Sequence, residues 1–283
     1  MWDILPRGKF LGGAPFNTAC HLKMLNQEVL VCSRVGDDQL GEQVINEIKQ
    51  RNINPNYIQI DTSHTTGIVE VTLDTFGNAS YHIKESAAWD FIEVTEYVLD
   101  ELKKIDILIY GSLAQRSRIS KNTIKQLLEL KKVNVFDVNL RPPYINVNTV
   151  RESLMAADIV KMNYDEFLQL AKWFSINNEL KLGVKEIADK FNCSTVCITK
   201  GANGAAVYHN FQFYEHPGFV VKVKDTVGSG DAFLAAFLKG IFDKKSNQKI
   251  LEFANAVGAY VATQNGATPK LDLNIINEII EGG

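Results

Sequence analysis

The segment DTVGSGDAF, residues 225–233, places two aspartates around two glycines where a helix is expected to begin. A stripe of apolar residues at helical spacing starts at Phe233, so Gly228, Ser229 and Gly230 lie at the helix start. The first N–H groups of a helix lack internal partners and carry the positive end of its dipole. Because glycine lets an anion approach those groups closely, the segment suits a phosphate group.

Asp231 lies in the first turn of this expected helix, and its carboxylate has two interpretations. It is a favourable charge at a helix start, worth about 0.3–1 kcal/mol, or a general base beside a bound phosphate. The spacing alone favours the first. Two familiar phosphate-binding motifs are excluded: no G-x-x-x-x-G-K-[ST] run occurs, and Phe233 occupies the place of the third glycine of a dinucleotide fingerprint.

The segment LGGAPFNTACHL, residues 11–22, is a second place where bare backbone precedes a short helix. Gly12 and Gly13 form a tight turn, or they let a small polar ligand approach the backbone. In the second interpretation Asn17 grips a hydroxyl group of that ligand, and Asp3 grips others. The segment alone does not decide between the two.

Polar residues also follow two apolar runs further along the chain. Asp137, Asn139 and Arg141 lie in FDVNLRPPY, at the end of a buried strand, where they either cap loops or meet a ligand. Asn163 stands at a helix N-cap with Glu166 three residues on, which is the spacing of a capping box. Glu166 has an alternative role, holding a metal ion through water.

Two glycine-containing segments near the carboxyl end of the chain have similar alternatives. In TKGANGAAVY, Gly201 and Gly204 form a hairpin turn or contact a nucleotide phosphate. The helix in NAVGAYVATQNGATP ends at Gly266. Its small residues pack against the glycine segment at 228–230, or they admit an adenine ring.

The elements that must position these residues alternate along the chain. Short apolar runs alternate with amphipathic helical patterns, which indicates a mostly parallel sheet covered on both faces. The runs expected to be strands are residues 28–36, 105–113, 133–140, 157–163 and 194–201. In such sheets ligands bind beyond the carboxyl ends of the strands, where most of the polar motifs fall.

The segment TTGIVEVTLDTFGNASYHIK, residues 65–84, breaks this alternation, because its apolar residues recur with period two on either side of FGN. The pattern predicts an antiparallel hairpin inserted into the α/β chain. The hairpin either extends the edge of the main sheet or forms a flap over a substrate. The second is favoured because the insertion comes early, just after the first helical units.

The composition bounds the class of protein. The chain has 283 residues, of which 46% are hydrophobic and 22% charged, with a net charge of −3 and a pI of about 6.0. These values suit one large globular unit and give no basic excess for nucleic acid. No apolar run is long enough for a bilayer, and the start lacks a signal-peptide pattern. Four cysteines predict reduced, mostly buried thiols rather than disulfides or zinc, so we expect a cytoplasmic protein.

Together and in this order, the motifs resemble the ribokinase-like (PfkB) family of carbohydrate kinases across essentially the whole chain. DTVGSGDAF is similar to the family's C-terminal signature, and LGGAPFNTACHL with VLVCSRVGDDQLGEQV resembles its N-terminal one. WDILPRGKFLGGAPFN, GSLAQRS and FDVNLRPPY look most like bacterial fructokinases. The resemblance implies a single domain, 1–283, with a three-layer α/β/α fold, a mostly parallel central sheet and a small β lid from about residues 7–14 and 62–85.

The resemblance also implies roles for the candidate residues. Asp231 would take the proton from a sugar hydroxyl as it attacks the γ-phosphate of ATP, and the N–H groups of Gly228, Ser229 and Gly230 would form the anion hole. The sugar would be held by Asp3, Gly12, Gly13, Asn17, Arg141 and Asp231. The ATP site would be formed by Asn163, Thr199, Gly201, Gly204, Gly228, Gly230 and Asn255.

The implied cofactors are ATP, Mg²⁺ and a monovalent cation such as K⁺. Glu166, in an N-x-x-E motif with Asn163, would hold Mg²⁺ through water. Asp225, with the backbone of residues 262–266, resembles the family's monovalent-cation loop.

We therefore expect an ATP-dependent sugar kinase that converts fructose to fructose 6-phosphate. Ribose and 2-keto-3-deoxygluconate are alternative acceptors, and a non-catalytic sugar- or nucleotide-binding relative is the alternative class. The expected partners are a small sugar and ATP, with no nucleic acid and no membrane. The edge of the lid hairpin also suggests a homodimer.

The chain departs from the family at its start. Family members have a complete first strand, ending in glycine, before the region that resembles Trp2-Asp3, whereas this sequence begins at Met1. That strand lies inside the sheet, so its absence is expected to leave neighbouring strands with unpaired backbone groups and Asp3 poorly anchored.

Overall fold

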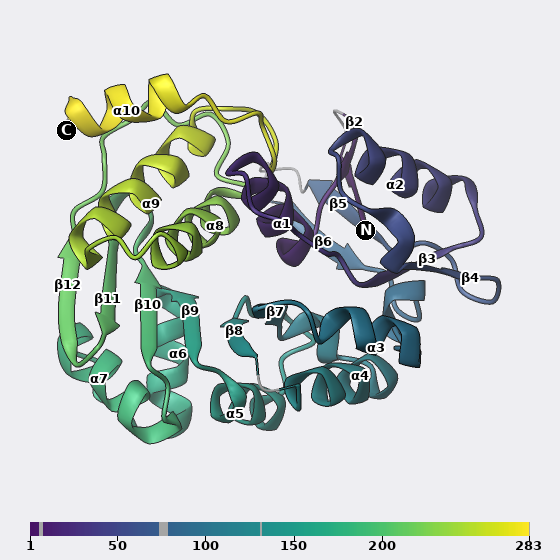
Figure 1. The fold of residues 1–283 in the computed structure, drawn as a ribbon, viewed down its shortest axis with the longest axis horizontal. Helices are drawn as coiled ribbons and strands as arrows, with labels where there is room; N and C mark the ends of the chain where they lie inside the picture. Colours follow the sequence, from purple (N-terminus) through teal and green to yellow (C-terminus); the bar gives the residue numbers. More distant parts are fainter. Residues whose placement is uncertain (6–7, 74–78, 131, 283) are drawn as a thin grey trace.

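Helices cover both faces of a six-stranded sheet in the computed structural model, which describes residues 1–5, 8–73, 79–130 and 132–282 (Figure 1). The sheet has the strand order β12-β11-β10-β9-β8-β7. Its strands are β7 Ile107–Gly111, β8 Val133–Asp137, β9 Ile159–Asn163, β10 Thr195–Thr199, β11 Ala205–His209 and β12 Gln212–His216. This is the three-layer α/β/α arrangement expected from the sequence.

The strands β7 to β10 run parallel, and β11 and β12 are antiparallel additions at one end of the sheet. Gly111 pairs with Asp137, and Asn163 pairs with Thr199, in the strand register. The carboxyl ends of the four parallel strands therefore meet along one edge. The polar residues that follow these strands in the sequence are brought together there.

Alternate side chains along the strands of the main sheet point to opposite faces, and each face packs against one layer of helices. Val135, Ile159 and Cys197 face one layer and pack with α1, α8, α9 and α10, whereas Phe136 and Val160 face the other. The first layer consists of α1 Ala14–Met24, α8 Ser229–Phe242, α9 Asn247–Ala262 and α10 Leu273–Glu281. The second layer consists of α4 Arg118–Leu128, α5 Val147–Ala156, α6 Tyr164–Phe174 and α7 Leu180–Phe191, with α3 Glu96–Leu102 beside α4.

A separate parallel pair, β3 Ser33–Gly36 and β4 Ile58–Asp61, is covered by α2 Gln39–Gln50. Val44 and Ile48 on α2 are buried against this pair. The expectation of a strand over 28–36 was too long: residues 28–32 make only an isolated bridge, Leu30 to Asn54. Among the described strands β3 pairs only with β4, so its extent is limited by a four-residue neighbour.

A second small sheet has the order β2-β1-β5-β6 and consists of β1 Trp2–Leu5, β2 Gly8–Leu11, β5 Ile68–Leu73 and β6 Ala79–Ile83. The antiparallel pairing of β5 with β6 confirms the predicted hairpin, whose FGN turn lies outside the described residues. Asp3 pairs with Phe10 on one side and Val69 on the other. The expectation that Asp3 is poorly anchored is therefore wrong, because β1 is an inner strand of this sheet.

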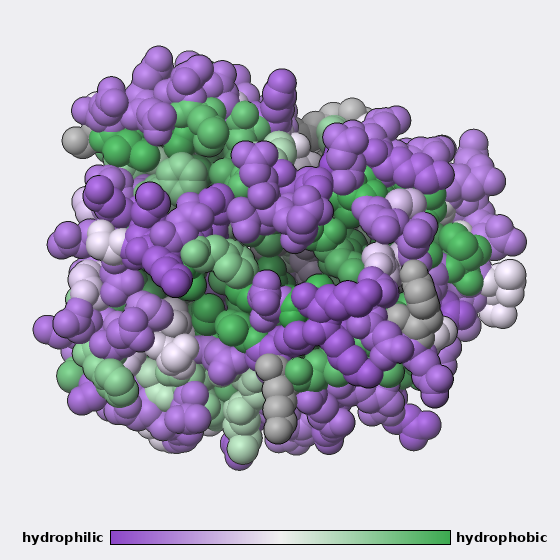
Figure 2. Space-filling model, viewed as in Figure 1, coloured by the Kyte–Doolittle hydropathy of each residue, from purple (hydrophilic) through white to green (hydrophobic). Residues whose placement is uncertain are grey.

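The main sheet stops at β7, and among the described strands none joins β7 to β3. Ile107 and Ile109 on β7 are only partly buried. Figure 2 shows a mostly hydrophilic face with a hollow near its centre, where hydrophobic side chains are visible between α1 and the region of β7.

The remaining structure is consistent with the sequence interpretation. Short 3-10 turns connect the elements: η1 Pro55–Tyr57, η2 Ala88–Phe91, η3 Leu113–Gln115 and η4 Gly201–Asn203. The four cysteines are free, as predicted, and all but Cys32 are buried. None of the helices in the described ranges is both long and apolar enough to cross a membrane.

Leu234 on α8 belongs to the hydrophobic core on this face of the sheet, and its side chain is fully buried. Leu234→Ala is expected to lower the free energy of unfolding by about 2–5 kcal/mol through lost burial and the cavity left behind. Urea unfolding measures this, with Leu182→Ala, which is 49% exposed on α7, as the control. Equal losses in the two variants would contradict this packing.

Candidate active site

The helices α1 and α8 pack together and join the two glycine-containing segments singled out in the sequence. The Asn17 side-chain amide donates a hydrogen bond to Asp231 Oδ2 at 2.8 Å, across 214 residues of sequence. Asn17 is only 4% exposed, and its Oδ1 has no partner among the described residues. A buried amide with an unused acceptor beside a carboxylate is typical of a polar binding site.

Gly228 forms the N-cap of α8 with φ of 81°, a left-handed conformation that favours glycine. A side chain there would also collide with the protein, because its Cβ would lie 2.2 Å from the Ala267 carbonyl oxygen. The start of α8 therefore carries no capping side chain. The N–H of Ser229 donates to the Thr226 carbonyl oxygen at 3.2 Å. Anion binding at the first N–H groups of α8 stays a prediction.

Asp231 lies in the first turn of α8, and its surroundings favour a base. Burial raises the pKa of Asp231 to about 6, against the lowering effect of Lys161. Asp137 adds to the rise, whereas the hydrogen bond from Asn17 and the charge of Arg141 oppose it. A carboxylate with a pKa near neutrality is well matched to taking a proton at physiological pH.

Lys161 was missed as a site residue by the sequence analysis. Its Nζ lies 3.0 Å from Asp137 Oδ1, and both side chains are buried. The two residues are register partners on β8 and β9, facing the same helical layer as Val135 and Ile159. The available signal was a charged residue inside the apolar run ADIVKMN.

The residues expected to hold the sugar come from the small sheet and from the end of β8. Asp3 lies against Gly12, where a Cβ would be 2.6 Å from Asp3 Oδ2. Gly13, with φ of 119°, has open space around it. Burial raises the pKa of Asp3, and the charge of Arg141 opposes that rise. Arg141 thus influences both Asp3 and Asp231, which places these three charged groups around one region.

Glu166 and Asn163 form the predicted capping box at the start of α6. Asn163 Oδ1 accepts from the Glu166 N–H, and Glu166 Oε2 accepts from the Asn163 N–H, each at 2.8 Å. Glu166 Oε1 also accepts from the N–H of Leu140, at 2.8 Å, which ties α6 to the loop after β8. Burial raises the pKa of Glu166.

A hydrated magnesium ion fits this chemistry better than a metal held directly by protein. Within the described ranges, no three His, Cys, Asp or Glu side chains cluster as direct ligands. Each carboxylate oxygen of Glu166 has a second lone pair, so it can still accept from a metal-bound water. Mg²⁺ commonly keeps several waters and takes its other ligands from substrate phosphates.

Asp225 lies beside the 262–266 segment, as the family resemblance implied. The N–H groups of Lys224 and Asp225 donate to the Ala262 carbonyl at 2.8 and 3.2 Å. Asp225 Oδ2 accepts from the N–H of Gly266 at 3.3 Å, and its Oδ1 accepts from Val227. A carboxylate next to loop carbonyl groups suits a hard monovalent cation, whose binding stays a prediction.

The two glycines after β10 differ in their surroundings. The β10–β11 pairing confirms the hairpin interpretation of this segment. Gly201 has φ of 58° and open space around its α-carbon, so a ligand can approach its backbone. At Gly204 a Cβ would lie 2.0 Å from the His216 carbonyl oxygen, so the need for glycine there is explained by packing.

Thr199 and Asn255 have local partners. Thr199, at the end of β10, is paired with Asn163 in the register and lies at the carboxyl edge of the sheet. Asn255 is buried in α9 and donates to the Leu251 carbonyl of its own helix at 2.7 Å. Their roles in ATP binding stay predictions.

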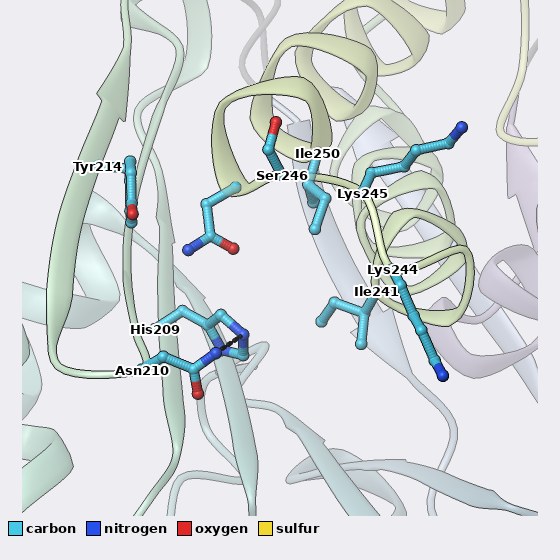
Figure 3. Close-up of a pocket in the computed structure, with 9 residues that line it drawn as sticks. His209, Asn210, Tyr214, Ile241, Lys244, Lys245, Ser246 and Ile250 are labelled. Carbon is cyan, nitrogen blue, oxygen red and sulfur yellow. Dashed lines mark hydrogen bonds between the residues drawn. The ribbon is translucent and has the colours of Figure 1, made fainter.

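A surface cavity of about 430 Å³ lies away from this region, between the β11–β12 turn and the α8–α9 connection (Figure 3). Its lining includes His209, Tyr214 and Ser246, at the opposite end of α8 from Asp231. In Figure 3 the side chains of Lys244 and Lys245 extend away from the cavity. Its lining contains neither the carboxylates nor the glycines found at the carboxyl edge.

Comparison with known proteins agrees with this geometry. Residues 7–273 match the pfkB family of carbohydrate kinases. A sugar kinase of Pyrococcus horikoshii is 30% identical over 283 residues, covering 95% of this chain and 87% of that protein. A fructokinase of Escherichia coli is 27% identical over 288 residues, covering 95% of this chain and 92% of that protein.

Solved structures show the same arrangement. The Pyrococcus horikoshii kinase in complex with ATP has a TM-score of 0.83 at 26% identity, covering 99% of this chain and 97% of that one. A fructokinase of Vibrio cholerae O395 with bound fructose, ADP and calcium has a TM-score of 0.82 at 25% identity, covering 99% and 96%.

The three-layer fold, with a carboxylate at a glycine-rich helix start, defines an α/β phosphotransferase of the ribokinase-like kind. The chain belongs to the pfkB family of carbohydrate kinases, and it is a sugar kinase of that family.

The raised pKa of Asp231 predicts a pH-dependent stability. A group whose pKa is raised on folding stabilises the protein below its unfolded pKa, and this contribution is lost as the pH rises through the folded value, about 6. Asp231→Asn has no such titration. Between pH 4 and 7 the free energy of unfolding of the variant should therefore rise by about 2 kcal/mol relative to that of the wild type.

Urea unfolding at several pH values measures this difference. Asp189→Asn, at an exposed position on α7, is the matched control and should follow the wild type. Parallel stability curves for Asp231→Asn and the wild type would contradict the raised pKa.

Proposed function

We propose that this sugar kinase is an ATP-dependent fructokinase that converts fructose to fructose 6-phosphate, with Asp231 as its general base. The observation that carries the proposal is the hydrogen bond from Asn17 to Asp231 at the start of α8. It joins the residue expected to hold a sugar hydroxyl to the residue expected to take its proton. The choice of fructose is supported by relatives named as fructokinases.

In the proposed reaction, Asp231 takes the proton of the acceptor hydroxyl while that oxygen attacks the γ-phosphorus of ATP. The bond from the γ-phosphorus to the bridging oxygen breaks, and ADP leaves. Asn17 occupies Oδ2 of Asp231, which leaves Oδ1 to face the hydroxyl. The N–H groups of Gly228, Ser229 and Gly230 stabilise the charge on the transferred group, which is the main demand of phosphoryl transfer.

The sugar would be held between the small sheet and the carboxyl edge of the main sheet. The Asp3 carboxylate accepts hydrogen bonds from sugar hydroxyls, and the Arg141 guanidinium donates to others. Gly12 and Gly13 keep the backbone before α1 free of side chains. The small sheet is the proposed lid, which would exclude water as a competing acceptor.

Glu166 would hold hydrated Mg²⁺, which supplies charge neutralisation to the phosphates of the nucleotide. Asn163 positions Glu166 through the capping box. Asp225 and the carbonyl groups of residues 262–266 would hold K⁺ behind the start of α8. Thr199 and Gly201, at the carboxyl edge, would contact the nucleotide, with Gly204 and Asn255 as further expected ATP-site residues.

Turnover with a panel of sugars tests the proposal. ADP release with ATP, Mg²⁺ and K⁺ is expected to be fastest with fructose, compared with ribose, 2-keto-3-deoxygluconate and glucose. Asp231→Asn should lower kcat by about 10²–10⁴-fold, since a positioned general base contributes roughly that much. The wild-type kcat/KM should fall below pH about 6, where Asp231 is protonated.

Three other outcomes of the panel each overturn a different part of the proposal. A faster reaction with another sugar overturns fructose as the acceptor and keeps the mechanism. Full activity of Asp231→Asn overturns the assignment of the base. Sugar and nucleotide binding without ADP release, from folded protein, indicates the non-catalytic alternative.

Removal of magnesium gives a separate prediction. A chelator should abolish turnover, and Glu166→Gln should raise the Mg²⁺ concentration needed for half-maximal rate by about tenfold, as second-layer contacts to metals commonly do. Thermal unfolding of the variant controls for the loss of the contact to Leu140. An unchanged Mg²⁺ requirement would exclude Glu166 from this role.

A homodimer formed through the edge of the small sheet stays part of the proposal, as does a cytoplasmic location. Sedimentation at micromolar concentration measures the oligomeric state. Monomer alone would exclude it.

A further inference from the structure

Lys161 is a charged residue in the middle of a buried strand. It is 7% exposed, and its neighbours Val160 and Met162 on β9 are fully buried. Its Nζ donates to Asp137 Oδ1 at 3.0 Å. Burying an ammonium is costly unless it is paired, and retaining one in a strand interior calls for a reason.

The surroundings of Lys161 are strongly acidic. The carboxylates that face it are Asp137 from β8, Glu166 from α6 and Asp231 from α8. Arg141, after β8, also acts on Asp231 but is exposed. Burial would lower the pKa of Lys161, but these carboxylates outweigh it and raise the pKa, so the ammonium stays charged.

The ammonium also lies directly against the first turn of α8. A Cβ added at Gly230 would be 3.3 Å from Lys161 Nζ, so glycine leaves the space that the lysine uses. An ammonium has three donors, and its described hydrogen bond to Asp137 uses one. The positive charge is thus placed beneath the same N–H groups that suit a phosphate.

We propose that Lys161 is a positioning residue for phosphoryl transfer: held by Asp137 beneath Gly230, its ammonium keeps Asp231 ionised. The inference rests on the proposed role of Asp231 as the base. Without Lys161, Asp231 shares a buried region with two other carboxylates and would hold its proton more tightly. Asp137 keeps the ammonium at a fixed place and leaves Asp231 Oδ1 available to a substrate.

The first experiment measures this coupling in the protein without substrates. The pH dependence of unfolding is compared for the wild type and Asp231→Asn, and again in a Lys161→Met background. The difference within each pair isolates the titration of Asp231. Ionisation of Asp231 lowers the free energy of unfolding as the pH rises. In the Lys161→Met pair, the midpoint of this change is expected to lie at least one pH unit higher than in the other pair. An unchanged midpoint overturns the inference.

The second experiment uses turnover. Because the proposed role of Lys161 is to keep Asp231 ionised, Lys161→Met should lower kcat at pH 7 by about two- to tenfold, as a rise of about one to two units in the pKa of Asp231 would, and by less at pH 9. The KM for the sugar should change less than about threefold, and the acidic limb of the pH profile should move upward. Lys161→Arg should restore part of kcat and the position of the limb. A general loss of activity with an unmoved limb would mean that Lys161 is only structural.

Lys121→Met is the matched control, because Lys121 forms an ion pair with Glu152 between α4 and α5, on the opposite helical layer. It should leave kcat, KM and the pH profile unchanged. If Lys161→Met fails to fold, Asp137→Asn combined with Lys161→Met removes both buried charges together and should fold more readily. A smaller upward shift of the limb is expected in that variant, because Asp137 raises the pKa of Asp231 by less than Lys161 lowers it. Absence of any upward shift there overturns the inference.

The two experiments separate this inference from the proposed function. No turnover by the wild type with any sugar, together with the shifted titration, would overturn the function and retain the coupling of Lys161 to Asp231. Turnover by the wild type without any shift in the Lys161 variants would retain the function and overturn the inference.

Discussion

The packing of α1 against α8 is the contact on which the site depends. Each helix begins after glycine, and the two starts are joined by the hydrogen bond from Asn17 to Asp231. His21 links α1 to the loop after α9, since its Nε2 lies 2.9 Å from the Ala267 carbonyl oxygen. Burial lowers the pKa of His21, so this contact is made by a neutral ring. Separating the helices would therefore dismantle the proposed base and its support together.

The carboxyl edge of the parallel strands collects the opposing charges of the site. Asp137 and Lys161 are placed opposite each other by strand register, and Asp231 is brought over them by α8. Glu166 is held by two backbone N–H groups rather than by a cation. The sheet thus fixes which charges meet, and the helices fix how deeply they are buried.

Local pattern predicted much of this structure. The alternation of apolar runs with helical stripes gave the layers, and the capping box at Asn163 was readable from spacing alone. The place of Lys161 in the site could not be predicted in this way, because its partner Asp137 lies 24 residues away and only strand register brings the two together. The length of β3 was also predicted wrongly, because an apolar run does not show how many residues of it will find a strand to pair with. The open space at Gly201 and the crowding at Gly204 likewise depend on tertiary contacts.

The contact of Gly228 with Ala267 links two loops that are distant in sequence. The position of a Cβ at Gly228 is already occupied by the Ala267 carbonyl group, so the backbones touch without intervening side chains. Backbone atoms in such contact transmit displacement with little compliance, since no rotamer can absorb it. A change in the conformation of the loop after α9 is therefore expected to move the start of α8, so the two loops move together.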